Sequence, residues 1–259
     1  MYQEERLHTI TEHLHTHERI AVDDICRWFD VSRDTARRDL SKLEARGEAV
    51  RTHGGALLAE KRHPVTDYAG RLQLVSEEKK RIGSMAAAMI HPGERIILDA
   101  STTVQACTEA MPDIACTVVT NSINQADILS TRTEVDIHLL GGHLDKEHRF
   151  LYGTSVIERL KTYQVDKVFL GVLGVSENGL TLAHEEDGWV KRQMVKQAAE
   201  VIVLADHTKL GKADFFTYAA LEDVDVLITD RPPSPAFQSI LAQHHVSVQT
   251  ADADKGATS

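Results

Sequence analysis

Apolar residues recur at helical spacing in three short stretches near the start of the chain. Polar and charged residues fill the positions between them, as expected for helices that bury one face. A short turn at Asp30 and Val31 separates the second stretch from the third, which indicates a helix-turn-helix. The apolar positions are Leu7, Ile10 and Leu14, then Val22, Ile25, Trp28 and Phe29, then Ala36, Leu40 and Leu43.

The third predicted helix carries the residue types that suit DNA. Ser32 is a preferred N-cap, because its hydroxyl accepts a hydrogen bond from a backbone N–H of the first turn. Guanidinium groups beyond such a start meet guanine edges and phosphates when the helix lies in a major groove. The alternative for this segment alone is a surface helix with solvated charges. Its candidate DNA contacts are Ser32, Arg33, Thr35, Arg37, Arg38 and Lys42.

A short β-hairpin is predicted directly after this helix. Gly47 stands where a helix C-cap is expected, and residues 49–56 have the pattern of two short strands around a tight turn. Such a hairpin is typical of the wing of a winged helix. We therefore predict double-stranded DNA as the partner of this region, with Arg51 and His53 near the phosphate backbone.

From residue 77 the pattern changes to helices that alternate with short apolar strands. A helix over residues 77–90 turns Ile82, Met85, Ala86 and Met89 inward. The alternation predicts an α/β domain with a mostly parallel sheet covered on both faces. In such sheets ligands bind beyond the carboxyl ends of the strands. The expected strands are Arg95–Leu98, Thr117–Val119, Asp136–Leu140, Lys167–Leu170, Val201–Leu204 and Val224–Ile228.

Small or polar residues follow five of these strands. Hydroxyl and N–H groups at a helix N-terminus bind phosphate or another anion, and glycines let the backbone approach a ligand. Each such element alone is ordinary turn chemistry. Together they predict a ligand site at the carboxyl ends of the strands. Its candidate residues are Asp99, Ser101, Thr102 and Thr103, then Thr120 and Asn121, Gly141 and Gly142, Gly171 and Gly174, and Asp206 and Lys209.

Charge is distributed unevenly along the 259 residues. The net charge is −10, but residues 32–53 hold six basic residues against four acidic ones. This concentrates positive charge where DNA contacts are expected, and acidity elsewhere disfavours non-specific binding. We expect a DNA-binding domain at 1–57, a polar linker at 58–76, an α/β sensing domain at 77–250 and a disordered tail at 251–259.

The motifs together resemble DeoR-type bacterial transcriptional regulators. The spacing of Arg6, Ile10 and Leu14, the run Ser32-x-x-Thr35-Ala36-Arg37-Arg38-Asp39-Leu40 and the wing at 51–56 carry the likeness in the first half. Ala36 replaces a larger aliphatic residue that is common there. In the second half the Asp-x-Ser-Thr-Thr, Thr-Asn, Gly-Gly and Asp-His-Thr-Lys-x-Gly elements follow the order of the family's sensor domain. The resemblance therefore covers nearly the whole chain.

This resemblance implies a sensor fold related to sugar-phosphate isomerases and a phosphorylated sugar as inducer. By it, Ser101, Thr102 and Thr103 would hold the phosphate, and the polar residues Asp99, Asn121, Asp206 and Lys209 would contact the sugar. By the same resemblance, Asp187 and Lys191 would also bind the effector, although the family usually has a glutamate where this chain has Asp187. The resemblance also implies a repressor of a sugar catabolism operon that acts as a homodimer or homotetramer.

Other classes of function receive less support. An isomerase-like enzyme is the alternative, with Asp206, Lys209 and Asp99 acting on an enediol, but an enzyme does not need a winged helix. His13 and His17 have a usable metal spacing, yet no cysteine or carboxylate cluster accompanies them. Cys26, Cys107 and Cys116 also lack metal spacing and are expected to be buried, reduced thiols. We expect a cytoplasmic protein without cofactor, metal or membrane segment.

Overall fold

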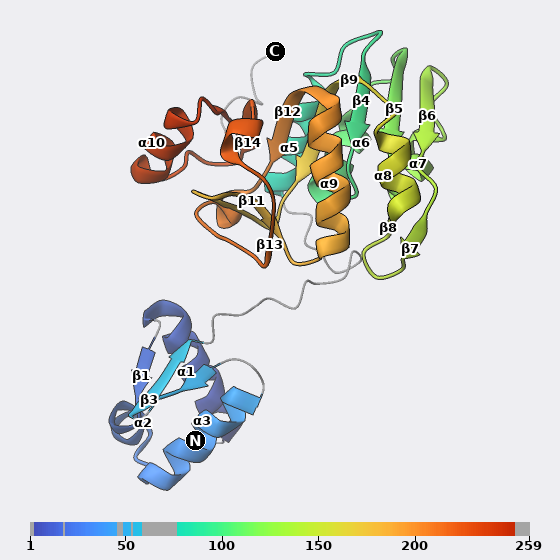
Figure 1. The fold of residues 1–259 in the computed structure, drawn as a ribbon. Helices are drawn as coiled ribbons and strands as arrows, with labels where there is room; N and C mark the ends of the chain where they lie inside the picture. Colours follow the sequence, from blue (N-terminus) through green and yellow to red (C-terminus); the bar gives the residue numbers. More distant parts are fainter. Residues whose placement is uncertain (1–2, 18, 46–48, 53, 59–76, 252–259) are drawn as a thin grey trace. The chain divides into compact units, whose positions relative to one another are not determined.

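The computed structural model describes residues 3–17, 19–45, 49–52, 54–58 and 77–251. Contacts between Cα atoms divide the chain into two compact units, Met1–Val65 and Thr66–Ser259. Figure 1 shows the helices and strands of each unit. None of the described helices is long and apolar enough to cross a membrane. Gly47, His53, most of the predicted linker and nearly all of the predicted tail lie outside the described residues.

The first unit is a helix-turn-helix with a small antiparallel sheet of order β1-β3-β2. The predicted wing is confirmed, since β2 and β3 pair with Val50 opposite Leu57. The pairing of β1 with β3 was not predicted, because three residues are too few to show a strand pattern. The elements are α1 (Gln3–His17), β1 (Arg19–Ala21), α2 (Val22–Phe29), α3 (Arg33–Ala45), β2 (Ala49–Arg51) and β3 (Gly55–Leu58).

The core of this unit contains an ion pair as well as apolar side chains. The predicted stripes of α1 and α3 are buried, and Ala36 is fully enclosed. Asp39 is also fully buried on α3, where its carboxylate accepts hydrogen bonds from Arg6 Nε at 2.9 Å and from Gln3 Nε2 at 2.8 Å. A buried carboxylate needs such partners to offset its lost hydration. This pair therefore fixes α3 against α1.

Trp28 is a correction to the predicted apolar face of α2. Its side chain is 46% exposed rather than buried. The indole contacts the ring of His13 edge-on, with centroids 4.5 Å apart. Ile25, by contrast, is fully buried at the centre of the face. Val22, Cys26 and Phe29 are half-buried and pack against the core around Ile25, and Trp28 lies at the edge of this contact.

The second unit is built on a parallel sheet of seven strands in the order β15-β14-β12-β9-β4-β5-β6. The chain enters at the centre in β4, adds β5 and β6 on one side, and then crosses to β9 on the other side. The strand order therefore reverses between β4 and β9. The strands are β4 (Arg95–Leu98), β5 (Cys116–Thr120), β6 (Val135–Leu139), β9 (Val165–Gly171), β12 (Ala198–Leu204), β14 (Val226–Thr229) and β15 (Ser247–Thr250).

Helices cover both faces of this sheet (Figure 1). Ile96, Leu98 and Val118 pack toward α5 and α6, whereas Ile97 and Val119 pack toward α8 and α9. Because both faces are covered, consecutive positions of the central strands are apolar, as in residues 96–98, 168–170 and 201–204. The helices are α5 (Glu77–Ala87), α6 (Thr102–Ala110), α7 (Ile123–Leu129), α8 (Thr154–Leu160), α9 (Glu185–Gln197) and α10 (Pro235–Gln243), with 3₁₀ turns η1 (His207–Lys209) and η2 (Leu221–Asp223).

Two small antiparallel sheets complete the unit. One has the order β10-β11-β13 and the other pairs β7 with β8. The predicted strands correspond to six of the seven strands of the large sheet, with ends that differ by a few residues. The strand at Ser247–Thr250 and the small sheets were not predicted. Their strands are β7 (His143–Asp145), β8 (Phe150–Tyr152), β10 (Gly174–Ser176), β11 (Gly179–Leu182) and β13 (Phe216–Ala219).

The three cysteines are free thiols. Burial raises the pKa of the Cys107 thiol to about 12. Burial also raises the pKa of Cys116, and the nearby Glu94 and Asp113 carboxylates add to that shift. Both thiols are therefore protonated and unreactive near neutral pH, because the thiolate is the reactive form.

The contact between α5 and α6 depends on Gly83. A Cβ at this position would lie 2.5 Å from the carbonyl carbon of Ala106 and 2.6 Å from the nitrogen of Cys107. We expect Gly83→Ala to lower the free energy of unfolding by about 1–3 kcal/mol through overpacking. Ser84→Ala, at the next and exposed position, should change it by less than about 0.5 kcal/mol. Urea unfolding followed by circular dichroism tests the pair, and equal stabilities would contradict the backbone contact.

Candidate functional site

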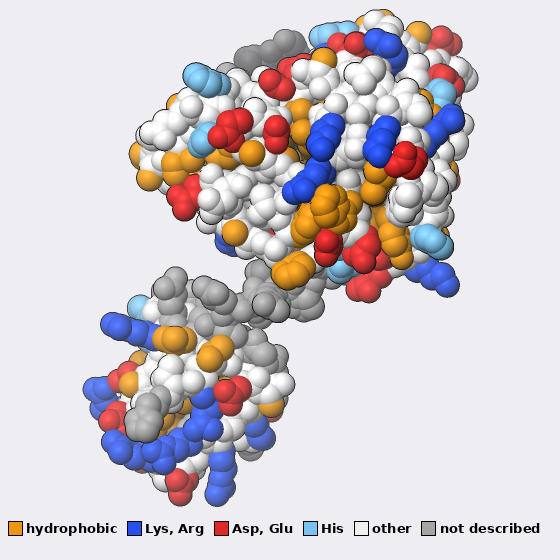
Figure 2. Space-filling model, in the orientation of Figure 1, with side chains coloured by type: hydrophobic (Ala, Val, Ile, Leu, Met, Phe, Trp, Pro, Cys, Tyr) orange, Lys and Arg blue, Asp and Glu red, His pale blue; other side chains and the backbone are white. Residues whose placement is uncertain are grey.

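The first candidate site is the outer face of α3. The Ser32 hydroxyl accepts a hydrogen bond from Thr35 N–H at 3.3 Å and lies 3.0 Å from the Thr35 hydroxyl, as an N-cap does. Arg33, Arg37, Arg38 and Lys42 are all exposed. Figure 2 shows Lys and Arg side chains gathered over α3. The helix thus presents a cationic surface whose start is fixed by its cap.

The cations of this surface differ in how firmly they are held. Arg33 pairs with Asp23 at 2.6 Å, and Lys42 donates to Gln3 Oε1 at 2.5 Å. Arg51, in the wing, donates to the Ser41 hydroxyl at 3.0 Å, which ties the wing to α3. The side chains of Arg37 and Arg38 have no hydrogen-bond or ion-pair partner among the residues that the structure describes. These two arginines are therefore ready to contact another molecule without first breaking a contact.

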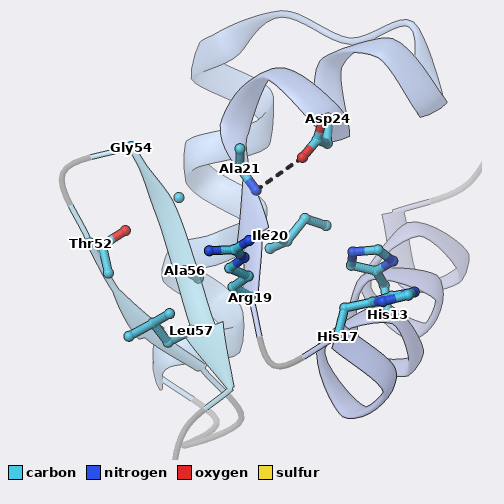
Figure 3. A pocket seen from close by; sticks show the side chains of 11 residues that line it. His13, His17, Arg19, Ile20, Ala21, Asp24, Thr52, Gly54, Ala56 and Leu57 are labelled. Carbon is cyan, nitrogen blue, oxygen red and sulfur yellow. Dashed lines mark hydrogen bonds between the residues drawn. The ribbon is translucent and has the colours of Figure 1, made fainter.

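A hollow of about 550 Å³ lies elsewhere on the first unit (Figure 3). It is lined by the end of α1, by β1 and by the wing, with His13 and His17 on one side, Thr52 and Leu57 on the other, and Arg19 between them. The His13 and His17 rings are 4.3 Å apart. In the described part of the chain, no three His, Cys, Asp or Glu side chains are placed to hold a metal ion.

The second candidate site lies where the strand order of the large sheet reverses, which is where ligands bind in such folds. Asp99, directly after β4, is fully buried. Its carboxylate accepts hydrogen bonds from Lys191 Nζ at 2.5 Å, from Gly171 N–H at 2.8 Å and from Ser101 N–H at 2.8 Å. Lys191 also donates to the Gly171 carbonyl at 2.7 Å. This network joins β4, β9 and α9 at one point.

The N-terminus of α6 stands beside this network. Ser101 is the N-cap, since its hydroxyl accepts a hydrogen bond from Val104 N–H at 3.1 Å. Gly171 lies so close that a Cβ there would come within 2.1 Å of the Ser101 hydroxyl oxygen. Lys79, in the first turn of α5, donates to the Thr102 hydroxyl at 3.3 Å. A helix N-terminus with an ammonium group beside it favours an anion.

Two buried amide side chains, Asn121 and Gln125, lie beside the Asp99 network and the start of α6. The Gln125 amide donates to the carbonyls of Asp99 and Ser101, and the Asn121 amide donates to the Leu151 carbonyl. These bonds orient both side chains and leave Gln125 Oε1 and Asn121 Oδ1 buried with no partner among the described residues. A buried acceptor without a donor is costly. A ligand with hydroxyl groups would supply the donors.

Tyr218 offers a hydrogen-bond donor to the same site, where Asn121 and Gln125 offer acceptors. Its hydroxyl is buried and has no hydrogen-bond partner in the part of the chain that the structure describes. Burial raises its pKa well above the usual value, and the negative charges of Asp99 and Asp187 add to the shift. The phenol therefore stays protonated near neutral pH and can donate a hydrogen bond. Asp187 itself lies 3.9 Å from Lys191 Nζ, one helical turn earlier on α9.

Several predicted residues have structural roles that sequence does not reveal. The Thr120 hydroxyl donates to the Leu98 carbonyl at 2.7 Å and accepts from Ser122 N–H, so it braces the end of β5. Asp206 caps η1 by accepting a hydrogen bond from Thr208 N–H at 3.0 Å. Thr103 is buried in the first turn of α6. Gly142 packs against the Tyr152 carbonyl, and Gly141 is exposed.

A second group of predicted residues gathers around η1. A bridge joins Val175, beside Gly174, to Leu210, beside Lys209, and Gly211 N–H donates to the Val175 carbonyl. The segment is also fixed by His207, whose backbone N–H donates to buried Asp230 at 2.6 Å. Hydrogen bonds and ion pairs connect Asp99 to Ser101, Gly171 and Lys191, and Lys191 also lies near Asp187. They do not extend to Asp206, Lys209 or the Gly141–Gly142 turn.

Sequence reasoning missed Lys79, Gln125 and Tyr218. Gln125 comes four residues after Asn121 in the first turn of a helix, which was the one available signal for it. Lys79 and Tyr218 reach the site from α5 and β13, and no local pattern marks them. The acid–base role considered for Asp99 is also corrected, because its carboxylate is already held by an ammonium group and two backbone N–H groups.

Comparison with known proteins gives one consistent family. Residues 6–62 match the DeoR-like helix-turn-helix domain, and residues 75–231 match the DeoR C-terminal sensor domain. The chain is 55% identical, over 99% of both chains, to the HTH-type transcriptional repressor GlcR of Bacillus subtilis (strain 168). It is 28% identical, over 96% of this chain and 99% of the relative, to the glycerol-3-phosphate regulon repressor of Escherichia coli (strain K12).

Two solved structures match part of this chain at lower sequence identity. Ribose 5-phosphate isomerase A from Methanocaldococcus jannaschii has a TM-score of 0.37 and 18% identity, over 51% of this chain and 53% of that chain. The eIF2B beta subunit from Chaetomium thermophilum has a TM-score of 0.44 and 19% identity, over 68% of this chain and 56% of that chain.

The buried ion pair can be tested against an exposed one. Lys191→Met removes the ammonium and leaves the Asp99 charge buried, which should cost about 3–5 kcal/mol of unfolding free energy. Lys161→Met removes an exposed lysine that pairs with Glu158 at 2.6 Å and should cost less than about 1 kcal/mol. Urea unfolding of both variants checks the difference. Similar small losses would mean that Asp99 does not depend on Lys191.

Proposed function

The chain belongs to the DeoR family of helix-turn-helix transcriptional regulators, and we propose that it is a repressor of sugar-related genes. In this proposal, the first unit binds operator DNA through α3 and the wing. The second unit binds a phosphorylated sugar, which releases the DNA. As a member of this family, the chain is a transcription regulator and not an enzyme.

The cationic face of α3 supports the DNA-binding part of the proposal. Arg37 and Arg38 are exposed and unpaired among the described residues, so they can reach base edges or phosphates at little cost. Arg33, Lys42 and Arg51 are held by neighbouring side chains, which suits residues that position the helix on the phosphate backbone. His53 stays a predicted contact of the wing.

The surroundings of Asp99 carry the effector part of the proposal. An anion is favoured at the α6 N-terminus by Ser101, Thr102 and Lys79. Hydroxyl donors are favoured by the buried oxygens of Asn121 and Gln125. A phosphorylated sugar has both kinds of group. The relative named as a glycerol-3-phosphate regulon repressor is named for a phosphorylated polyol, which is consistent with this class of ligand.

The effector must favour the state that does not bind DNA. A ligand shifts such an equilibrium only by the difference between its affinities for the two states. We propose a homodimer or homotetramer as the active form, because a helix-turn-helix dimer places two recognition helices on two half-sites about one helical turn of DNA apart.

The role of Arg38 can be measured directly. If Arg38 makes a bidentate base contact, Arg38→Ala should weaken operator binding by about 1–3 kcal/mol and relax the preference at one base pair. The matched control is Arg27→Ala, which removes an exposed arginine of α2 that pairs with Asp24. Fluorescence anisotropy on DNA selected by the protein from a random library gives both affinities. Equal affinities for wild type and Arg38→Ala would remove Arg38 from the DNA contacts.

The phosphate loop has its own test. Thr102→Val keeps the side-chain shape and removes the hydroxyl, so operator binding should persist while release by the effector is lost. Thr108→Val makes the same change in the same helix, where the hydroxyl only donates to the Val104 carbonyl. Release is measured by titrating hexose and pentose phosphates into the protein–DNA complex. Normal release from the Thr102→Val variant would contradict the phosphate assignment.

A further inference from the structure

The outward face of α9 has a regular pattern that the proposed function does not use. Glu185, Trp189, Arg192 and Lys196 are spaced by four, three and four residues and therefore share one stripe of the helix. The opposite face, with Val190 and Met194, is fully buried against the sheet. Trp189 stands in the middle of the stripe and is 43% exposed.

The centre of this stripe is rigid. Trp189 Nε1 donates to Glu185 Oε1 at 3.0 Å, and the indole packs against Phe216 with ring centroids 5.5 Å apart. The Arg192 guanidinium lies 4.8 Å from the Trp189 ring and donates to the carbonyls of Thr217 and Tyr218. Side chains already fixed in this way lose little conformational entropy when another surface covers them.

The two ends of the stripe carry opposite charges. Glu185 and Glu186 stand at the start of α9, and Arg192 and Lys196 stand toward its end. Figure 2 shows this order over α9, with basic side chains toward one end, an apolar patch, and acidic side chains toward the other. Eleven residues separate Glu185 from Lys196, which is about 16 Å along a helix.

We propose that this stripe is an isologous interface between two copies of the chain, with the two α9 helices antiparallel. A two-fold axis near the middle of the stripe places the acidic end of each helix against the basic end of the other. The same axis brings the two Trp189–Arg192 centres together. Tryptophan and arginine are the residues most enriched at the energetic centres of interfaces.

The charge pattern favours a second copy over an unrelated partner. A stripe that is acidic at one end and basic at the other is complementary to itself when reversed. An interface of standard size buries about 800 Å² on each partner, more than one helix face provides. The exposed Phe215, which precedes β13 beside α9, adds apolar area next to the stripe.

This proposal rests on the oligomeric state proposed above, and the experiment separates the two. Sedimentation equilibrium of the full-length wild type first gives its mass. A monomer at tens of micromolar would overturn both proposals. If the wild type is a dimer or tetramer, charge variants of α9 test the interface alone.

Two variants reverse opposite ends of the stripe. Glu185→Lys with Glu186→Lys makes both ends of the stripe basic, and Gln193→Glu with Lys196→Glu makes both ends acidic. Each variant alone should fall to half the mass of the wild type, with a dissociation constant raised about tenfold or more by like-charge repulsion. An equimolar mixture should regain the wild-type mass, because basic then faces acidic.

Recovery on mixing cannot come from damaged folding, so it distinguishes an interface from simple destabilisation. Variants that keep the wild-type mass, or a mixture that stays at half mass, would overturn the assignment of α9. Should either charge variant unfold, as judged by circular dichroism, Trp189→Ala carries the test with the same expected loss of mass. Its control is Leu139→Ala, which removes an exposed apolar side chain of β6. Loss of mass in the control but not in Trp189→Ala would place the interface at the sheet edge instead.

Discussion

The sensing unit depends on one buried ion pair. Asp99 and Lys191 lie 92 residues apart in sequence, yet their charged atoms are 2.5 Å apart and shielded from water. Neither charge is tolerable there alone, so the pair sets the ends of β4 and β9 and the orientation of α9 together. Gly171 makes the arrangement possible, because any larger residue would collide with Ser101. The start of α6 and the end of β9 are held by hydrogen bonds to the same carboxylate.

The large sheet was predictable because its strands are buried on both faces and read as apolar runs. Ser247–Thr250 escaped prediction, since an edge strand with half-exposed polar residues lacks that run. The wing and the Ser32 cap were visible because turns and caps are local chemistry. The partners of Asp39 and Asp99 were not, because those pairings exist only after distant segments meet. The same limit hid Gln125, Lys79 and Tyr218.

Helix α9 links the buried Asp99 network to the surface of its unit. Asp187 and Lys191 face the Asp99 network, whereas Trp189 and Arg192 stand on the surface. Because these contacts lie on opposite faces of one helix, a shift of α9 would change both sets. In the other unit, Asp39 has a comparable role, since it holds α3 from behind while Arg37 and Arg38 stay exposed in front.

Gly83 gives the fold an unusual mechanical property. Most helices meet through a layer of side chains that absorbs small displacements by changing rotamer. At Gly83 the backbones of α5 and α6 meet without that layer. Lys79 lies one turn earlier on α5 and contacts Thr102 at the start of α6. A displacement of the α6 backbone would therefore pass directly to the α5 backbone, because no side chains lie between them to absorb it.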